Sequence, residues 1–316
     1  MFLQLLIGGV AMGLIYALIA IEYTLIYNSC ALLNFAHGQL VMFGAYIFAG
    51  TMVTSLGMSF AAGWIGTIIL SGNIGVALAL SVFIPLKDVG KLYAIIATLM
   101  FSMMITDSVT LLWGQYPFYL NGYLSGIIRI GMIAFPVVYF YIIAICAVVV
   151  VLLLYFMNKT KTGRAMKCVS ENKGMAAMVG INVKKNMVIT IVLSVIICAV
   201  VGMLLAPLLS VTITMGSTVS SKGFTVGVLG GFGSVPGAII GGLIVGVIEN
   251  CATMYIPSVY KDVISYVILF LVILIKPNGI LGTARVKMTG KPAVLEAEGG
   301  AAGRFPLSGR CGPGGQ

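Results

Sequence analysis

The sequence contains very little charge for its length. Of its 316 residues, 60% are apolar and only 8% are charged, about a third of the share found in soluble domains. Such a chain cannot build a water-solvated surface, which excludes a soluble enzyme. Its apolar residues run in blocks with almost no charge between them, and this pattern is typical of an integral membrane protein.

The sequence also lacks the patterns of several kinds of chemistry. It contains no G-x-x-x-x-G-K-[ST] phosphate loop, no G-x-S-x-G elbow and no H-E-x-x-H motif. Its six cysteines are scattered without a C-x-x-C pair, and its one histidine, His37, has no second ligand at metal-binding spacing. We therefore expect no catalytic site, no metal site and no cofactor in this chain, so any ATP would be used by partner subunits.

The few charges are not spread evenly along the chain. Residues 158–186 contain seven cations against one acid, and the stretch from Lys276 to the end contains six against two, so these segments hold the whole net charge of +10. Neither has the interleaved aromatics or the motifs of a nucleic-acid binder, and no nucleic-acid partner is expected. The positive-inside rule predicts that both segments lie in the cytoplasm.

The apolar stretches predict an all-α polytopic membrane protein. A helix needs about 20 apolar residues to cross a bilayer. Eight stretches fit that length or approach it: 2–26, 32–56, 60–84, 92–113, 132–157, 187–210, 224–248 and 263–275. Residues 1–290 are expected to form the transmembrane domain, whereas 291–316 changes to Gly, Ala, Pro and single charges and is typical of a disordered or non-native tail.

Two of the eight stretches are interrupted. Three crossings between 158–186 and the basic tail would place that tail outside, so we interpret the Gly-rich stretch 224–248 as a broken or re-entrant helix. One interrupted segment in each half predicts an inverted repeat with the translocation pathway at the breaks. We assign that pathway to Asn34, His37 and Gln39 in the first break and to Gly230, Gly231, Gly233 and Pro236 in the second.

Three ionisable residues lie within apolar stretches, and each has two interpretations. Glu22 either belongs to a pathway or meets headgroups at the interface, His37 either gates a pathway or is packed, and Asp107 either titrates or is solvated. Titration of any of them would suit an alternative function, an ion-coupled secondary transporter or channel for a small polar solute. A structural subunit without a pathway is disfavoured by the paired interruptions.

The loop 158–186 is expected to contain a short amphipathic helix. Met175, Met178 and Val179 recur at i, i+3 and i+4, and Gly180 is a good C-terminal cap. Such a helix either lies on the membrane or docks into the groove of a partner, and the spacing does not choose between them.

Five segments together resemble the permease of branched-chain amino acid ABC transporters, the LivH type. They are GLIYALIA at 13–20, NFAHG at 34–38, the stretch 163–182, VLGGFGSVPGA at 228–238 and KPNGILG at 276–282. The match runs in order from near the N-terminus to Gly282. The tail past Lys291 has no counterpart in the family, and the loop with Lys87 and Lys91 is leaner in arginine than the family's.

The resemblance implies a subunit of the bacterial inner membrane, surrounded by lipid. It implies three kinds of partner: a second related permease subunit, two cytoplasmic ATPase subunits and an extracytoplasmic solute-binding protein. It also implies that the cargo is a branched-chain or related amino acid. It further implies that 163–182 is a cytoplasmic coupling loop whose short helix docks on the ATPase. The coupling residues would be Gly163, Arg164, Ala165, Glu171, Ala176, Ala177, Gly180 and Ile181.

Overall fold

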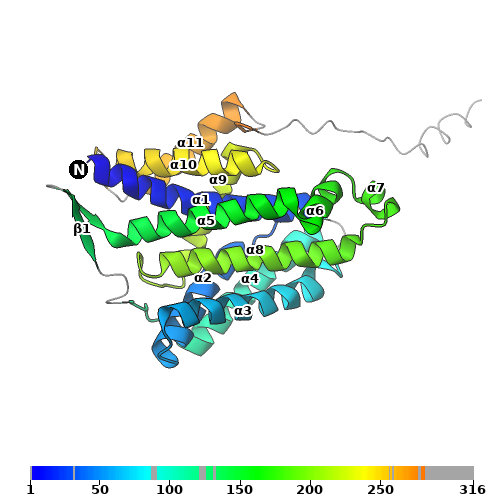
Figure 1. Cartoon of the computed structure of the whole chain (residues 1–316), viewed down its shortest axis with the longest axis horizontal. Helices are drawn as coiled ribbons and strands as arrows, with labels where there is room; N and C mark the ends of the chain where they lie inside the picture. Colours follow the sequence, from blue (N-terminus) through cyan, green and yellow to red (C-terminus); the bar gives the residue numbers. More distant parts are fainter. Residues whose placement is uncertain are drawn as a thin grey trace, which may run out of the picture. The chain divides into compact units, whose positions relative to one another are not determined.

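Apolar helices make up most of the computed structural model (Figure 1). It describes residues 2–30, 33–86, 91–120, 126–130, 133–255, 257, 260–276 and 279–281. The helices are α1 (Phe2–Cys30), α2 (His37–Tyr46), α3 (Phe60–Leu78), α4 (Lys91–Trp113), α5 (Val137–Lys159), α6 (Lys161–Glu171), α7 (Lys173–Met178), α8 (Val183–Leu205), α9 (Met215–Gly230), α10 (Val235–Ala252) and α11 (Lys261–Ile275), with the π-helical segments η1 (Ile47–Ser55) and η2 (Ala79–Phe83) after α2 and α3.

The predicted all-α polytopic fold is confirmed. Six helical segments of the described chain are long and apolar enough to cross a membrane: α1, α3 with η2, α4, α5, α8 and α10. Two of the eight predicted stretches form the shorter helices α2 with η1 and α11, and 224–248 divides between the end of α9 and α10. All described residues belong to the unit Met1–Thr283, and the second unit, Ala284–Gln316, has no described residue. The predicted domain limit at 290 and the predicted tail 291–316 therefore lie outside the described residues.

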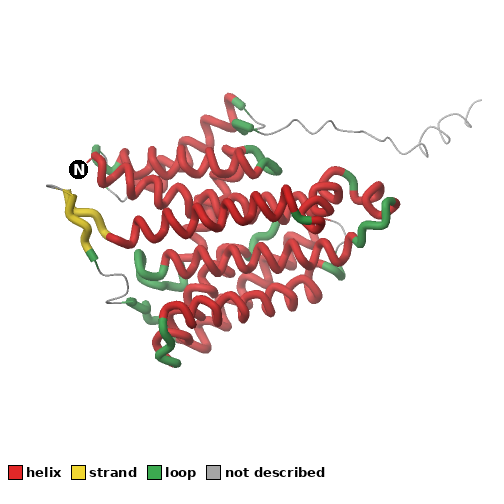
Figure 2. The backbone as a smooth tube through the Cα atoms, viewed as in Figure 1, coloured by secondary structure: helices red, strands yellow, loops and turns green. Residues whose placement is uncertain are grey.

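Prolines explain two limits that the apolar pattern misplaces. The stretch 132–157 does not begin as a helix: strands β1 (Ile127–Ile130) and β2 (Ile133–Pro136) form an antiparallel hairpin, with Ile127 opposite Pro136 (Figure 2). Pro136 then caps α5 in an extended conformation. The stretch 187–210 ends as a helix at Leu205, because Pro207 lacks the amide hydrogen that would continue it.

The helix packing supports the predicted inverted repeat. In the first half α1 packs on α9 and α10, and in the second half α8 packs on α2 and α3. Similarly, α2 contacts α4 and α9 contacts α11. Helices α1, α2, α3 and α4 of the first half therefore correspond, in this order, to α8, α9, α10 and α11 of the second half. The end of α1 and the start of α8 line one cavity, so these related helices run in opposite directions.

The two central helices, α1 and α8, contain more buried residues than any other helix of the described chain. In the apolar part of α8, 72% of the residues are buried inside the protein, against 22% in the apolar part of α4. The hairpin and the pair α6 and α7 lie at opposite ends of the bundle (Figure 1). Leu281 lines a cavity with α6 residues, so the chain beyond α11 begins at the end that carries the basic loop 158–186, as predicted. It returns there because four helices, not three, follow that loop.

Candidate functional site

The first predicted break lies at the start of α2. Helix α1 ends at Cys30 and α2 begins at His37, so the polar cluster lies at the start of a helix and does not interrupt one as predicted. Asn34 precedes α2, whereas His37 and Gln39 belong to its first turn. The Asn34 side chain accepts a hydrogen bond from the Ala36 amide at 3.0 Å. The Asn34 carbonyl lies 3.1 Å from Nδ1 of His37. The cluster therefore folds the turn with its own polar groups.

His37 is enclosed by protein. Its side chain is fully buried and meets the Tyr23 ring edge to face, with centroids 3.8 Å apart. Its Nε2 has no hydrogen-bond partner among the described residues, and the same holds for Nδ2 of the buried Asn34. Two buried polar atoms with free hydrogen-bonding capacity are thus available close to the turn.

The start of α2 meets the start of α9. A Cβ added to Gly38 would lie 2.6 Å from Cβ of Ser220 and would collide with the Gly216 carbonyl. A Cβ added to Gly216 would lie 2.7 Å from Oε1 of Gln39. The counterpart of the first break is therefore the beginning of α9, and not the Gly-rich break at 230–237 that the sequence suggested.

The Gly-rich stretch is broken, as predicted, between α9 and α10. Gly231 and Gly233 adopt φ values of +90° and +100°, and the Ser234 side chain caps α10 by accepting from the Gly237 amide at 3.2 Å. The amides of Ile280 and Leu281 donate to the carbonyls of Leu229 and Gly230 at 2.8 and 3.2 Å. Two of the segments that carry the family resemblance thus pack against each other.

An aromatic cluster connects the two predicted breaks. Tyr23 contacts His37, and its ring centroid lies 5.9 Å from Phe224 and 6.4 Å from Phe232. The second break itself lies near the end of the bundle that carries α6, because Gly233 and Pro236 line a cavity with α6 residues. The two predicted breaks are therefore linked through Tyr23, which contacts His37 in the first and Phe232 in the second.

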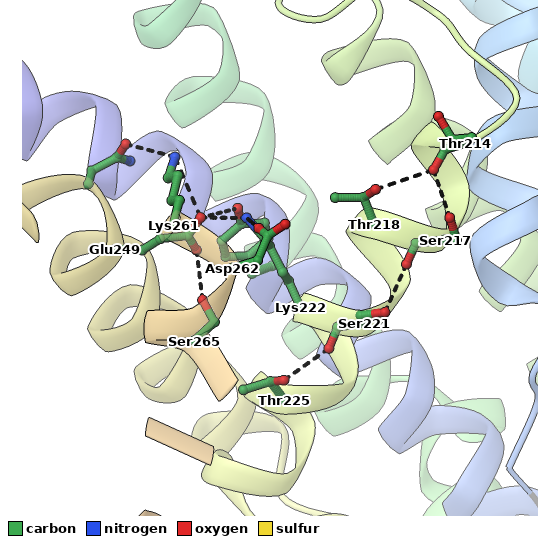
Figure 3. A network of polar contacts seen from close by, with 12 residues as sticks. Thr214, Ser217, Thr218, Ser221, Lys222, Thr225, Glu249, Lys261, Asp262 and Ser265 are labelled. Atoms are coloured by element: carbon green, nitrogen blue, oxygen red, sulfur yellow. Dashed lines mark hydrogen bonds and ion pairs between the residues drawn. The ribbon is translucent and has the colours of Figure 1, made fainter. Parts of the chain in front are cut away.

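A line of hydroxyls on α9 was not predicted (Figure 3). Ser217 donates to the Thr214 carbonyl at 2.8 Å, and Ser221 and Thr225 each donate one turn back along the helix at 3.0 Å. Thr214, Ser217 and Thr218 are exposed. Their helical spacing was visible in the sequence, but this part of the chain lay between two predicted apolar stretches. An exposed hydroxyl face suits a polar solute or a protein partner better than hydrocarbon.

Next to these hydroxyls, charged side chains from three helices form a network (Figure 3). Nζ of Lys222 on α9 lies 2.5 Å from Glu249 on α10 and 2.8 Å from Asp262 on α11. Lys261 lies 3.5 Å from Glu249 and donates to Asn250 at 3.1 Å. Two cations and two acids cancel, which is how charges persist inside a membrane protein. The sequence showed only that the charges outside the two basic segments sum to zero. Which side chains form the ion pairs depends on the tertiary structure.

The two carboxylates flagged in the sequence differ in environment. Glu22 is fully buried, and the Ser194 hydroxyl of α8 donates to its Oε1. The interfacial interpretation of Glu22 is therefore wrong: α1 continues for two more turns, to Cys30, and α8 covers the carboxylate. Asp107 is exposed on α4.

The predicted coupling loop contains two helices. Asn172 separates α6 from α7 and caps α7 by accepting from the Gly174 and Met175 amides at 2.9 and 3.1 Å. Helix α7 ends at Met178, and Gly180 follows with φ +86°. The predicted helix and its glycine end are therefore confirmed. Met175, Met178 and Val179 are 60%, 80% and 81% exposed, so this apolar face has no cover within the described chain.

The predicted coupling residues divide by exposure. Arg164, Glu171, Ala177 and Gly180 are exposed, Ala165 and Ile181 are half-buried, and Gly163 and Ala176 are buried. Gly163 packs directly on the backbone of Phe156 and Met157 at the end of α5. The exposed members could touch a partner, whereas Gly163 and Ala176 can only support the loop.

Comparisons with known proteins place this chain in a family. Residues 5–273 match the family described as branched-chain amino acid transport system / permease component. Two similar proteins are the high-affinity branched-chain amino acid transport system permease proteins LivH of Salmonella typhimurium, 34% identical, and LivH of Escherichia coli, 33% identical, each over 90% of this chain and 97% of the relative.

A third relative carries another name. The permease protein BraD of the high-affinity branched-chain amino acid transport system of Pseudomonas aeruginosa is 32% identical, again over 90% of this chain and 97% of the relative. Because the family match covers most of the chain and the identities exceed 30%, this multi-pass membrane protein belongs to the branched-chain amino acid transport system permease family.

Proposed function

We propose that this chain is the membrane-spanning permease subunit of an ATP-binding-cassette importer, which moves branched-chain or related amino acids across the bacterial inner membrane. The observation that carries the proposal is the near full-length similarity to permease proteins of branched-chain amino acid transport systems. Six apolar helices of spanning length agree with it.

The partners follow from the same proposal. A second related permease, two cytoplasmic ATPases and an extracytoplasmic solute-binding protein complete the importer, and ATP is used by the ATPases alone. The sequence supports this division, since it has no phosphate-binding loop. The exposed apolar face of Met175, Met178 and Val179 on and after α7 supports an ATPase contact, because exposed apolar patches mark sites of interaction with a protein or a membrane.

The cargo is proposed to pass between the two permeases along the hydroxyl face of α9. This face begins at the contact between α2 and α9, where the Gln39 side chain lies beside Gly216. Asn34 and His37 belong to the same turn at the start of α2. Hydroxyls can bind both the ammonium and the carboxylate of an amino acid. The break at Gly230, Gly231, Gly233 and Pro236 would then form the cytoplasmic end of the route.

Reconstitution of the complete importer in proteoliposomes tests this function. With the solute-binding protein outside and ATP inside, uptake of labelled leucine is expected, and it should stop when the phosphate-loop lysine of the partner ATPases is replaced. Liposomes containing this chain alone should show no transport driven by a pH gradient. Transport in that second preparation would contradict the proposal and favour the ion-coupled alternative.

A further inference from the structure

A cavity lies between the transmembrane bundle and α6. It has a volume of about 360 Å³ and is walled by the ends of α1 and α5, by α6, by α8 and by the break between α9 and α10. Pockets for small molecules have volumes of about 300–1,000 Å³, so this one fits a ligand of small size. It lies at the end of the bundle that carries the basic loop, which the charge distribution assigns to the cytoplasm.

The lining combines both signs of charge with an apolar wall. Lys167 and Glu171 lie one turn apart on α6, so they share a face of that helix. Leu25, Leu154 and Met157 line the opposing helices α1 and α5. A cation, an anion and an aliphatic wall in one cavity are the three features that a zwitterion with an apolar side chain requires.

Some of these polar groups are not satisfied by the protein. The ammonium of Lys167 donates to the neutral side-chain oxygen of Asn158 at 2.5 Å. Among the described residues every ion pair belongs to the network around Glu249, so neither Lys167 nor Glu171 is neutralised by one. Ser29, only 2% exposed, also lines the cavity, and its hydroxyl has no hydrogen-bond partner in the described chain.

We propose that this cavity binds a free apolar amino acid from the cytoplasm and thereby slows the importer. The carboxylate contacts Lys167, the ammonium contacts Glu171, the Ser29 hydroxyl supplies a further hydrogen bond, and the aliphatic side chain lies on Leu25, Leu154 and Met157. The inference rests on the proposed function, and it adds regulation by accumulated product. Because Gly233 and Pro236 also line this cavity, the regulatory site lies at the cytoplasmic end of the proposed route.

A connection from this cavity to the coupling helix exists in the structure. Glu171 also lines a second hollow of about 210 Å³ between α6 and α7, together with Met175 and Val179. Glu171 is the last residue of α6 and lies next to the start of α7. A ligand that contacts Glu171 therefore contacts the junction of the two helices. Fixing α6 in this way would restrict the movement of α7 that an ATPase cycle requires.

The test uses the whole importer in proteoliposomes with ATP inside and unlabelled leucine added to the lumen. The initial rate of labelled valine uptake should fall as luminal leucine rises. Replacing Lys167→Met removes a charge-assisted hydrogen bond, so half-inhibition should require at least about tenfold more leucine. Uptake without luminal leucine should be retained. Lys161→Met is the matched control, because Lys161 is, like Lys167, an exposed lysine of α6 but does not line the cavity.

Two leucine analogues separate the charges. 4-Methylpentanoate lacks the ammonium group and 3-methylbutylamine lacks the carboxylate, so neither should inhibit from the lumen as leucine does. A second variant, Ser29→Ala, should raise the leucine concentration for half-inhibition a few-fold. If Lys167→Met does not assemble, crosslinking of a diazirine-bearing leucine to the unmodified complex gives an independent result, with labelled peptides expected from α1, α5 and α6.

The failures can be told apart. Absence of uptake by the unmodified importer without luminal leucine would contradict the proposed function. Normal uptake that luminal leucine does not slow, or that slows equally in Lys167→Met, would overturn the inference alone. An effect of Lys167 that follows anionic lipid and not leucine would assign the cavity to a lipid headgroup, which also overturns it.

Discussion

The carboxylate of Glu249 joins α10 to three other helices. Its Oε1 accepts from Tyr16 on α1 at 3.4 Å and from Lys222 on α9 at 2.5 Å, and its Oε2 accepts from Ser265 on α11 at 3.1 Å. Lys222 also lies 5.6 Å from the centre of the Tyr16 ring. Helix α11 is short for a membrane span, and this network gives it a polar attachment in addition to its apolar contacts.

Replacing Lys222→Met is expected to destabilise the protein strongly. Breaking one partner of a buried pair leaves an uncompensated charge, at a cost of about 3–5 kcal/mol. The double variant Lys222→Met with Glu249→Gln should lose less than the sum of the single losses, because no unpaired Glu249 charge remains. Thermal unfolding in mild detergent measures the loss of stability in Lys222→Met, in Glu249→Gln and in the double variant. The exposed Lys184→Met is the control, with a change within about 0.5 kcal/mol, and additive losses would contradict the assignment.

At the scale of elements, helices α1 and α10 cross with their backbones in contact. A Cβ on Gly13 would lie 2.7 Å from the Gly242 carbonyl oxygen, and one on Gly9 would lie 2.9 Å from Cα of Val247. The Gly9-x-x-x-Gly13 and Gly242-x-x-x-Gly246 spacings therefore meet each other. Small residues permit this approach, which supplies the close packing that holds membrane helices together.

Replacing Gly13→Ala should separate α1 from α10. Over-packing of this kind costs about 1–3 kcal/mol or more, since the obstructing atoms belong to backbone. Gly72→Ala on α3 is the matched control: its added Cβ would meet only Ile196 Cδ1 at 3.8 Å, so it should be neutral or slightly stabilising. The yield of monodisperse protein and the unfolding temperature are measured for both variants. Equal behaviour of the two variants would show that the crossing is not tight.

Local signals in the sequence predicted part of these elements. Apolar length located the spans, Gly231 and Gly233 marked a true break, and Gly180 marked the end of α7, because each depends on neighbouring residues. The start of α9 at Met215 and the pairing of Lys222 with Glu249 could not be predicted, since they arise from contacts between distant segments. The same limit hid the cavity around Lys167, which five separate elements enclose.

At the scale of the whole molecule, the end of the bundle with α6 and α7 presents an uncovered apolar face formed by Met175, Met178 and Val179. Gly180 has φ +86°, and nothing lies within 4 Å of a Cβ added there. A larger residue is therefore opposed by its backbone conformation, which costs about 1–2 kcal/mol, and not by lack of space. The turn after α7 sets the direction in which Met178 and Val179 face outward.

Replacing Gly180→Val should release this turn and reduce co-purification of the ATPase by at least several-fold, while the chain still inserts in the membrane. ATP-driven uptake should fall in parallel. Gly57→Val is the matched control, because Gly57 also has a positive φ, +58°, with open space around it, but lies between η1 and α3. Retention of the ATPase by both variants, or its loss from both, would refute the coupling role of the turn.

The contact between Gly38 and Gly216 has a mechanical consequence for the two halves of the molecule. Each half approaches the other there through bare backbone, with a Cβ on either glycine meeting the opposite main chain. Only Gln39 and Ser220 place side chains beside this contact, so few side chains have to move when one half rotates against the other. An importer must open alternately to the two sides of the membrane, and a smooth pivot between its repeats is the geometry that such a motion needs.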